Sequence, residues 1–152
     1  MIMDMPSEMT VHPVGHVRNS VDERMMHEWR KVESGLVIDP AYESLLDGLE
    51  GFSHIIVLFW MHWSTGPSPS KVHPRGRSDI PLTGVFATRA PHRPNSIGVT
   101  VVRLLDRRGS TIKVRGLDAV NGTPIIDIKP YLPMDVIPYA SFPEWVAKLD
   151  FT

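Results

Sequence analysis

The sequence predicts a mainly β protein, folded as a single small antiparallel β-barrel with one to three short helices. Three observations lead to this prediction. Residues 53–63 are almost continuously apolar, β-branched or aromatic, as expected of a central strand covered on both faces. Turn sequences at 106–110 and 119–124 separate shorter strand-like segments and indicate consecutive hairpins. The chain has 152 residues, which suffice for one ordinary domain with a real core.

The other expected strands are rich in β-branched residues and are separated by turn residues. Pro40 is expected to bend the second strand or to place it at a sheet edge. Asn121 and Gly122 mark the last tight turn, because this pair tolerates positive backbone φ angles. Besides the central strand, the expected strands are residues 11–20, 35–42, 84–88, 97–106, 111–117 and 124–130.

Three segments have helical features. Residues 22–33 form a candidate helix with Asp22 as its N-cap, and residues 142–151 a terminal helix with Pro143 in its first turn. Residues 42–52 form the third candidate, which a glycine ends. Apolar spacing supports the first and third helices, through Met25, Met26, Trp29 and Val32 in one and Leu45, Leu46 and Leu49 in the other.

The composition bounds the class of protein. No cysteine is present, so disulfides and thiolate metal sites are excluded and a cytoplasmic location is permitted. Residues 1–10 contain acids but no basic or long apolar run, so we expect a disordered or frayed start instead of a signal peptide. The longest apolar run, residues 55–61, is too short to span a bilayer. We therefore expect a soluble cytoplasmic protein without membrane contact.

Charge is unevenly distributed along the chain. The formal net charge of −1 argues against nucleic-acid binding by overall positive charge alone. Residues 71–108 are nevertheless rich in Lys, Arg and His, whereas many acids precede residue 51. Residues 64–81 are a long loop between two core strands, rich in Pro, Gly and Ser. Such loops are uncommon unless they are mobile or bind something, although a solvated surface also explains the charge.

Residues 89–98 combine strand ends with polar chemistry. Two prolines fix the backbone and remove donors, so a shaped loop is expected here instead of a strand ladder. Arg89 and Arg93 offer planar donor forks, and Asn95 offers a donor and an acceptor. Gly98 gives room for a ligand or a second backbone. Two interpretations stay open: a site for carboxylate, ribose or phosphate oxygens, or an arginine-braced turn that pairs with acids of a neighbouring strand.

Common catalytic and cofactor motifs are missing. The sequence contains no Gly-rich dinucleotide loop, no Walker loop, no G-x-S-x-G and no H-E-x-x-H. His54, His62, His73 and His92 lack the short spacing of metal ligands, so no metal site is expected.

Three long segments carry a family resemblance: GVFATRAPHRPNSIGVTVV, GLEGFSHIIVLFWMH and LDAVNGTPIIDIKPYLP. Together they resemble the TsaA/TrmO family, the S-adenosylmethionine-dependent tRNA methyltransferases with a β-barrel instead of a Rossmann fold. The match includes the R-P-N-x-I-G and D-I-K-P-Y-L-P strings in the family's order. We therefore expect a TsaA-like barrel domain over residues 11–135 and a C-terminal tail with a short helix over residues 136–152.

The resemblance implies a homodimer of small barrels that binds the methyl donor, S-adenosylmethionine, near the subunit interface. It also implies methyl transfer to the exocyclic amine of a threonylcarbamoyl-modified adenosine next to the anticodon of tRNA. Some bacterial members carry an extra C-terminal domain that helps to hold tRNA, and we expect this chain to lack it. Lys71, Arg75 and Arg77 of the long loop are then expected to bind tRNA phosphates.

Family positions transfer to single residues of this chain. Arg93 and Asn95 are candidates for catalysis or for organising the substrate and the loop, and the catalytic residue itself stays unassigned. A Pro-Arg-Gln element of the family falls near residues 28–30. Ser96 and His92 depart from the family pattern, so local rigidity is expected to differ. The implied donor-binding residues are Glu28, Trp29, Arg30, His62, Trp63, Arg89, Val99, Gly116, Leu117, Asp118 and Ala119.

Two classes of function stay open. In the first, the protein is a tRNA methyltransferase, which the basic middle segment and the R-P-N-x-I-G string favour. In the second, it is a donor-binding or regulatory module, or a small-molecule methyltransferase of the same fold, which the nearly neutral net charge favours. Asp127 and Lys129 are either pocket residues or a structural ion pair.

Overall fold

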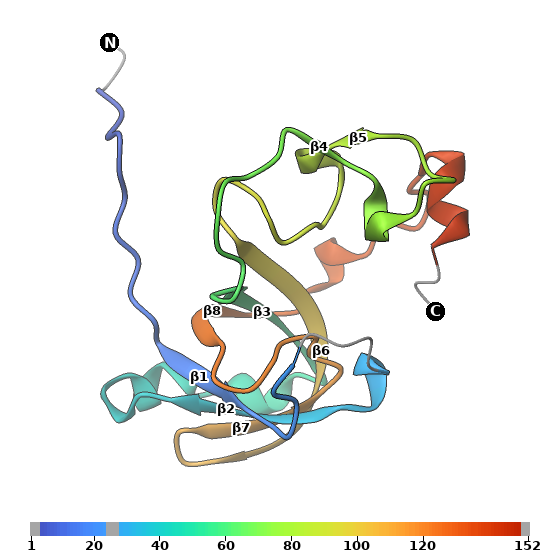
Figure 1. The fold of residues 1–152 in the computed structure, drawn as a ribbon. Coiled ribbons are helices and arrows are strands. Elements are labelled where there is room, and N and C mark those ends of the chain that lie inside the picture. The colour runs from blue at the N-terminus through green and yellow to red at the C-terminus, as the bar shows by residue number, and fades with distance from the viewer. Residues whose placement is uncertain (1–3, 24–27, 150–152) are drawn as a thin grey trace.

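The computed structural model describes residues 4–23 and 28–149 and shows a closed six-stranded antiparallel β-barrel (Figure 1). Neighbouring strands follow the order β1-β2-β7-β6-β3-β8, and pairing of β8 with β1 closes the barrel. This architecture confirms the predicted mainly β, TsaA-like small barrel. Its strands are β1 (Gly15–Arg18), β2 (Glu33–Ile38), β3 (His54–Trp60), β6 (Ile97–Arg108), β7 (Thr111–Arg115) and β8 (Pro124–Pro130), and β4 (Lys71–Val72) and β5 (Thr83–Gly84) form a separate small sheet.

Several predicted strands are shorter than expected. β1 is four residues long, and β2 ends before Pro40, where a helical segment begins. The predicted strand 84–88 is wrong, because β5 ends at Gly84 and a tight turn follows. In that turn the N–H and the hydroxyl of Thr88 both donate to the carbonyl of Val85 (3.1 and 2.8 Å), so these groups are not available for a strand ladder.

Every helical segment of the described residues is a short 3₁₀ helix. The predicted helix 42–52 is two segments, separated by Gly48 with a left-handed φ of 90°. The first segment begins at Pro40, where the Asp39 carboxylate accepts from the N–H of Ala41 (2.9 Å). The segments are η1 (Trp29–Lys31), η2 (Pro40–Leu46), η3 (Leu49–Gly51), η4 (Pro74–Gly76), η5 (Val85–Ala87), η6 (Pro133–Asp135) and η7 (Glu144–Lys148).

The predicted helix 22–33 is wrong in its extent. Among the described residues of this segment, 22–23 and 28–33, only η1 is helical, and the turn that Asp22 would cap lies largely outside the described residues. Glu33 already belongs to β2, because its pairing with Arg115 of β7 draws this end of the segment into the barrel. Met25 and Met26 lie outside the described residues.

The terminal helix and the leucine face also differ from expectation. η7 covers only part of the predicted 142–151, with Pro143 as its N-cap instead of inside the first turn. Leu45 is 76% exposed, because a 3₁₀ turn of three residues places it away from the face shared by the other two leucines. None of the described helices is long and apolar enough to cross a bilayer.

The core lies inside the barrel and depends on alternation along the strands. Ile55, Val57 and Phe59 of β3 are at most 3% exposed, whereas the residues between them are half-buried. In the single chain β3 is therefore not covered on both faces as expected. The core consists of Val17, Leu36, Ile38, Leu46, Ile55, Val57, Phe59, Val102, Ile112, Val114, Leu117, Ala119 and Ile125.

Gly98 of β6 is a packing position. It pairs across the strands with Phe59, and a Cβ atom at Gly98 would lie 2.4 Å from two carbons of the Phe59 ring. Gly98 thus gives room to a core ring of its own chain, which corrects the expectation that a ligand or a second backbone approaches it.

We expect Gly98→Ala to destabilise the protein by roughly 1–3 kcal/mol, because the added methyl overpacks the ring of Phe59. Urea unfolding gives the comparison. The control is Gly51→Ala, whose Cβ would meet no atom within 4 Å and which should change stability by about 0.5 kcal/mol or less. Equal stability of the two variants would contradict this packing role.

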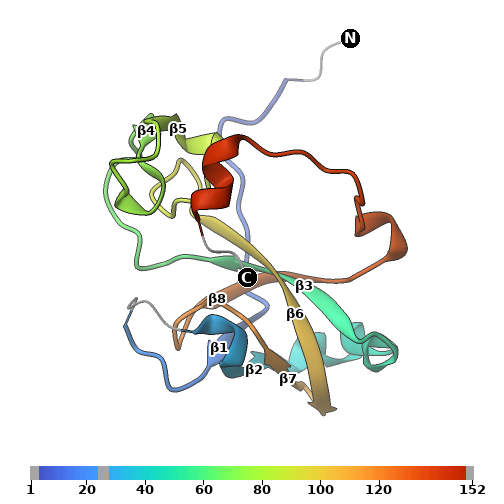
Figure 2. The same ribbon diagram turned by 90° about the vertical axis from the view of Figure 1, so that its right-hand side faces the viewer.

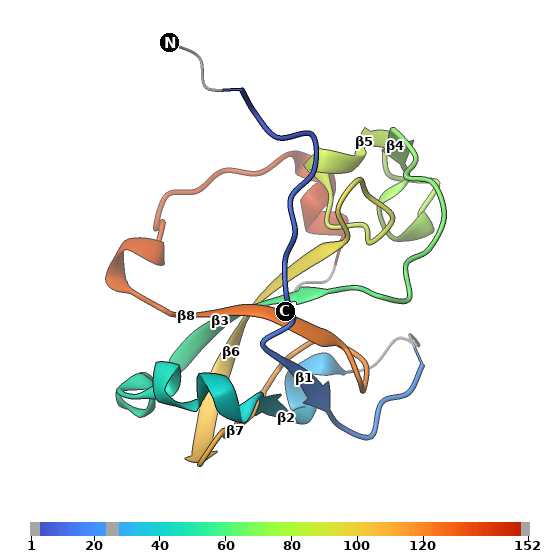
Figure 3. The same ribbon diagram turned by 90° about the vertical axis from the view of Figure 1, so that its left-hand side faces the viewer.

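The C-terminal segment leaves the barrel after β8, arcs outward and returns to the loops above the barrel (Figures 2 and 3). There η7 contacts the long loop. The Arg77 guanidinium donates to the carbonyl of Lys148 (2.5 Å), and the Lys148 ammonium donates to the carbonyl of Asp79 (3.1 Å). Leu149 is 7% exposed, so the end of the described chain is anchored by both polar and apolar contacts.

Candidate functional site

The first half of β6 has an open edge. β3 pairs with β6 along residues 97–103, but β7 joins the opposite edge only at Arg103. On that side, the backbone groups of residues 97–102 have no strand partner among the described residues. The Asp118 carboxylate accepts a short hydrogen bond from the Thr100 hydroxyl, so the segment 116–119 faces this edge. Apart from the Ile97 N–H, which donates to the carbonyl of Asn95 (2.7 Å), backbone N–H and C=O groups without a strand partner therefore line one side of a candidate site.

The segment 116–119 is held from three directions. The Gly116 N–H donates to the carbonyl of Val32 (3.0 Å), which directly follows η1. The Asn19 amide donates to the carbonyl of Ala119 (2.9 Å). Leu117 and Ala119 are buried in the core, so only the Asp118 side chain and backbone groups can meet a ligand. The fold thus brings part of the predicted donor set to one end of the barrel, namely residues 28–30, 99 and 116–119.

The side chains of this set do not all point the same way. Val99 is 45% exposed on the outer face of the sheet, so only its backbone lies at the open edge. Hydrogen bonds from Lys113 and then from Arg115 lower the pKa of Glu33, whose carboxylate pairs with both cations at 2.8 Å. Arg115 is thereby held next to Gly116, and because one carboxylate serves two cations, this group keeps one positive charge.

The loop that leads into β6 is braced by its own side chains. One guanidinium nitrogen of Arg93 donates to the carbonyls of Thr88 and Ala90, both at 3.1 Å. The Ser96 hydroxyl donates to the carbonyl of Pro91 (2.9 Å). Arg93 therefore organises the loop. The arginine-braced turn is present, but its acceptors are backbone carbonyls and not acids.

Arg89 and Asn95 are the polar side chains that this loop presents to solvent. Both are exposed, and neither side chain has a hydrogen-bond or ion-pair partner among the described residues. The N–H of Met61 donates to the carbonyl of Ser96 (2.8 Å), so His62 and Trp63, which follow β3, lie beside the base of the same loop. Two groups of predicted donor residues therefore lie at the two ends of the open edge.

The predicted phosphate-binding residues are not equivalent. Lys71 is exposed on β4 and has no partner among the described residues. Arg75 adopts a left-handed φ of 54°, which is unusual outside glycine. Arg77 is committed to Asp79 (2.6 Å) and to η7, and its hydrogen bond lowers the pKa of the Asp79 carboxyl. Arg77 therefore holds the loop together, which corrects its expected role as a free phosphate ligand.

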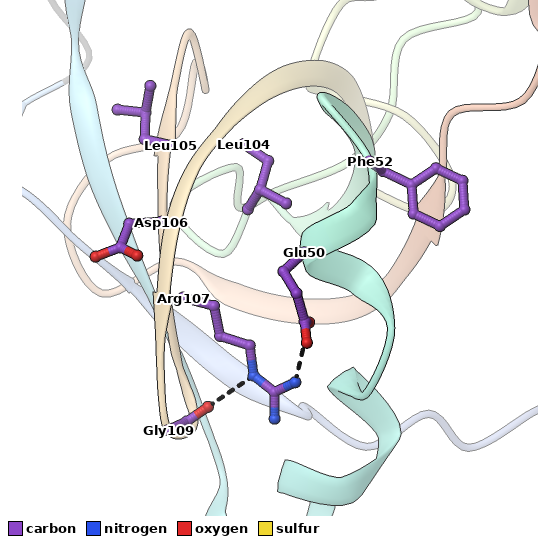
Figure 4. Close-up of a pocket in the computed structure, with 7 residues that line it drawn as sticks. All are labelled: Glu50, Phe52, Leu104, Leu105, Asp106, Arg107 and Gly109. Carbon is purple, nitrogen blue, oxygen red and sulfur yellow. Dashed lines mark hydrogen bonds and ion pairs between the residues drawn. The ribbon is translucent and has the colours of Figure 1, made fainter.

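Two cavities lie away from these residues. One, of about 440 Å³, surrounds Arg107, whose guanidinium pairs with Glu50 (3.2 Å) as Figure 4 shows, and also with Asp47 (3.1 Å). The other, of about 330 Å³, is lined mainly by apolar residues. Neither includes a predicted donor residue. The first is lined by Glu50, Phe52, Leu104, Leu105, Asp106, Arg107 and Gly109, and the second by Leu45, Leu46, Asp47, Gly48, Leu49, Phe52, Ile128 and Pro130.

Other predicted groups have structural partners. Asp127 and Lys129 form an ion pair (2.8 Å), which matches the structural interpretation of these residues. Nδ1 of His54 hydrogen-bonds the hydroxyl of Ser53, and Nδ1 of His73 hydrogen-bonds the carbonyl of Ile80. Among the described residues, no three His, Asp or Glu side chains are grouped to hold a metal ion.

Sequence reasoning missed Thr100 and Asn19. Both fix the 116–119 segment, but Asn19 is 100 positions from its partner Ala119 and Thr100 is 18 positions from Asp118. No local pattern signals such contacts.

Comparison with known proteins decides the family. Residues 24–135 match the model of the tRNA-methyltransferase O N-terminal domain. The chain belongs to this family. A "Probable S-adenosyl-L-methionine-binding protein" of Methanothermobacter thermautotrophicus is 44% identical over 82% of this chain and 90% of its own length. A human "tRNA (adenine(37)-N6)-methyltransferase" is 47% identical over 59% of this chain and 20% of its own length.

A solved structure has the same fold. The crystal structure of TrmO from Pseudomonas aeruginosa superposes with a TM-score of 0.73 at 32% identity, covering 88% of this chain and 61% of that one. The chain therefore spans less than two thirds of that TrmO and a fifth of the human relative.

We expect Arg93→Ala to speed amide hydrogen exchange in residues 88–92, because two backbone carbonyls lose their donor. Hydrogen-exchange mass spectrometry measures the effect. Arg89→Ala is the matched control, since this neighbouring arginine has no partner among the described residues. Equal exchange in the two variants would show that Arg93 does not brace the loop.

Proposed function

We propose that this protein uses S-adenosylmethionine to methylate the exocyclic amine of a threonylcarbamoyl-modified adenosine next to the anticodon of tRNA. The observation that carries the proposal is the open edge of β6, which faces Asp118 close to a loop that presents the unpaired Arg89. Membership of the family and the name of the human relative support methylation of an adenine in tRNA, and the name of the archaeal relative supports binding of the methyl donor.

The donor-binding groups are assigned by their chemistry. The adenine edge of the donor needs both a hydrogen-bond donor and an acceptor, which the free backbone at Val99 and the segment 116–119 offer. Asp118 accepts from a hydroxyl or an ammonium group, and its bond from Thr100 fixes the orientation of the carboxylate. Arg89 supplies a planar fork that suits the carboxylate of the donor. η1 and His62 border the same site.

Catalysis is then mainly a matter of position. The bound donor supplies a methyl group made electrophilic by its sulfonium. The residues of this chain hold the acceptor amine in line with that methyl, and such alignment can account for a large part of a rate enhancement. The amine that receives the methyl group donates a hydrogen bond to the side-chain carbonyl of Asn95. This bond orients the lone pair of the amine nitrogen. A strong base is unnecessary, because the amine becomes more acidic as the new bond forms.

tRNA binding uses few cations. Lys71, which has no partner among the described residues, contacts phosphates together with Arg75 of the same loop, and Arg77 holds the loop through its pair with Asp79. Because few counterions are released, the affinity for tRNA should depend only weakly on salt. Such a protein acts where mature tRNA is found, and we place it in the cytoplasm.

A donor-binding module is the second candidate. The relative that matches this chain over 90% of its own length is named as an S-adenosylmethionine-binding protein, whereas the human relative named as a tRNA enzyme is much longer. A small-molecule methyltransferase of the same fold belongs to this alternative. Donor binding without transfer to tRNA would favour it.

We also propose a homodimer formed through the outer face of β3 and β6. Ile97, Val99 and Val101 of β6 are 43–48% exposed, and they lie opposite Trp60, Leu58 and Ile56 of β3. We call these six residues the outer stripe. A two-fold axis would pair this apolar surface with itself and bury it.

Methyl-labelled S-adenosylmethionine and total tRNA test the reaction. We expect label on adenosine in tRNA from cells that make the threonylcarbamoyl modification and none in tRNA from cells that lack it. Label in neither sample, together with donor binding, would reject the tRNA methyltransferase in favour of the binding module.

Arg89→Ala is expected to weaken donor binding about tenfold or more, because a charge-assisted hydrogen bond contributes roughly 1.5–3 kcal/mol. Thr100→Val should weaken it less, since Asp118 remains but loses its orienting partner. Calorimetry with S-adenosylmethionine measures both effects, with Arg108→Ala as a control on an exposed arginine at the far end of β6. Unchanged affinity in Arg89→Ala would remove this residue from the site.

A further inference from the structure

The segment 132–143, which we call the arm, has no role in the proposed reaction. It forms most of the arc that stands away from the barrel (Figures 2 and 3). Exposed apolar surface of this density marks an interaction site in a folded protein. Five large apolar side chains of the arm are 56–95% exposed, namely Met134, Val136, Ile137, Tyr139 and Phe142.

Both ends of the arm are fixed to its own chain. It begins just after Pro130, which pairs with Ile55 of β3. It ends at η7, where the contacts of Lys148 with the long loop and the burial of Leu149 hold the chain. Three prolines within the arm restrict its backbone further. The apolar side chains are therefore held outward in a limited set of conformations, which lowers the entropy cost of binding.

The chemistry of the arm selects the kind of partner. Asp135 is its single charged residue, and the carboxylate is used to accept from the N–H of Leu132 (2.8 Å). RNA is a polyanion, and proteins hold it mainly with cations, which the arm does not have. An apolar protein surface is the matching partner.

The outer stripe is such a surface, but it is small. Stable protein interfaces involve roughly 20–30 residues on each side, whereas the stripe has six. The arm continues from the edge of the stripe, because β8 pairs with β3 and places Lys129 beside Ile56. Two copies related by a two-fold axis would each contribute one stripe and one arm.

We propose that the arm clasps a second copy of this chain and packs its apolar side chains on the partner's barrel beside the outer stripe. This inference rests on the homodimer proposed above and goes beyond it by assigning the C-terminal residues, most of which lie outside the family match over 24–135. Tyr139 and Phe142 are the expected anchors, since aromatic residues dominate the energy of interfaces.

Crosslinking tests the contact directly, because the chain has no cysteine of its own. Tyr139→Cys carries a benzophenone maleimide and is mixed with unmodified ¹⁵N-labelled chain under conditions of subunit exchange. We expect light-induced crosslinks to the labelled chain that map to its barrel. Leu45→Cys, at a position on η2 that is also highly exposed (76%, against 95% for Tyr139), is the control. Crosslinks only within one chain, or equal crosslinking from position 45, would overturn the clasp.

Sedimentation separates the clasp from the dimer itself. The double variant Ile137→Asp, Phe142→Asp should raise the dimer dissociation constant tenfold or more, whereas Leu45→Asp should not. If Val101→Asp in the outer stripe dissociates the dimer but the arm variant does not, the clasp is overturned and the proposed dimer is supported. A monomeric parent protein would overturn both. An intact dimer whose arm variant binds tRNA less tightly would overturn the clasp in favour of an RNA surface, and the methyl-transfer assay tests the reaction independently.

Discussion

The difference in length between two paired strands shapes the candidate site. β6 has twelve residues and β7 has five, so β7 can cover only the second half of β6. The register shift between Leu104 and Asp106 lies where the pairing with β7 begins. The second half of β6 therefore pairs with β7 within the barrel, whereas its first half presents a free edge on that side. A longer β7 would cover the backbone groups to which we assign donor binding.

The loops above the barrel are stabilised without using all of their charges. Irregular backbone must satisfy its polar groups without a ladder, and Arg93, Ser96 and His73 supply side-chain hydrogen bonds to carbonyls for this purpose. Arg89 stands four residues before Arg93 and is left exposed. Two arginines of one loop thus have separate tasks, one holding the shape and the other available to a ligand.

Neutralisation within the chain explains how a protein with a net charge of −1 can still present local positive charge. Arg77, Arg107 and Arg115 are each paired with acids of their own chain. Lys71 and Arg89 are not paired among the described residues; Lys71 lies on β4 and Arg89 on the loop that leads into β6. Charge counted along the sequence overstates the basic surface of residues 71–108, because several of its cations have structural partners.

The sequence by itself determined the barrel class, the main strands and the loop character of residues 89–96, since these follow from local alternation, prolines and turn pairs. Residues 64–81 are a loop only in part, because β4 and η4 lie within them. It also determined the family, because three long strings match in order. Only the tertiary structure decided the role of each polar residue. Arg77 and Arg93 hold their loops through hydrogen bonds to backbone carbonyls. Gly98 makes room for the Phe59 ring, and Val99 offers only its backbone to the open edge. Thr100 donates to the Asp118 carboxylate. The physical reason is that hydrogen-bond partners and buried faces are set by strand register and by contacts between distant residues, which residue type and spacing do not specify.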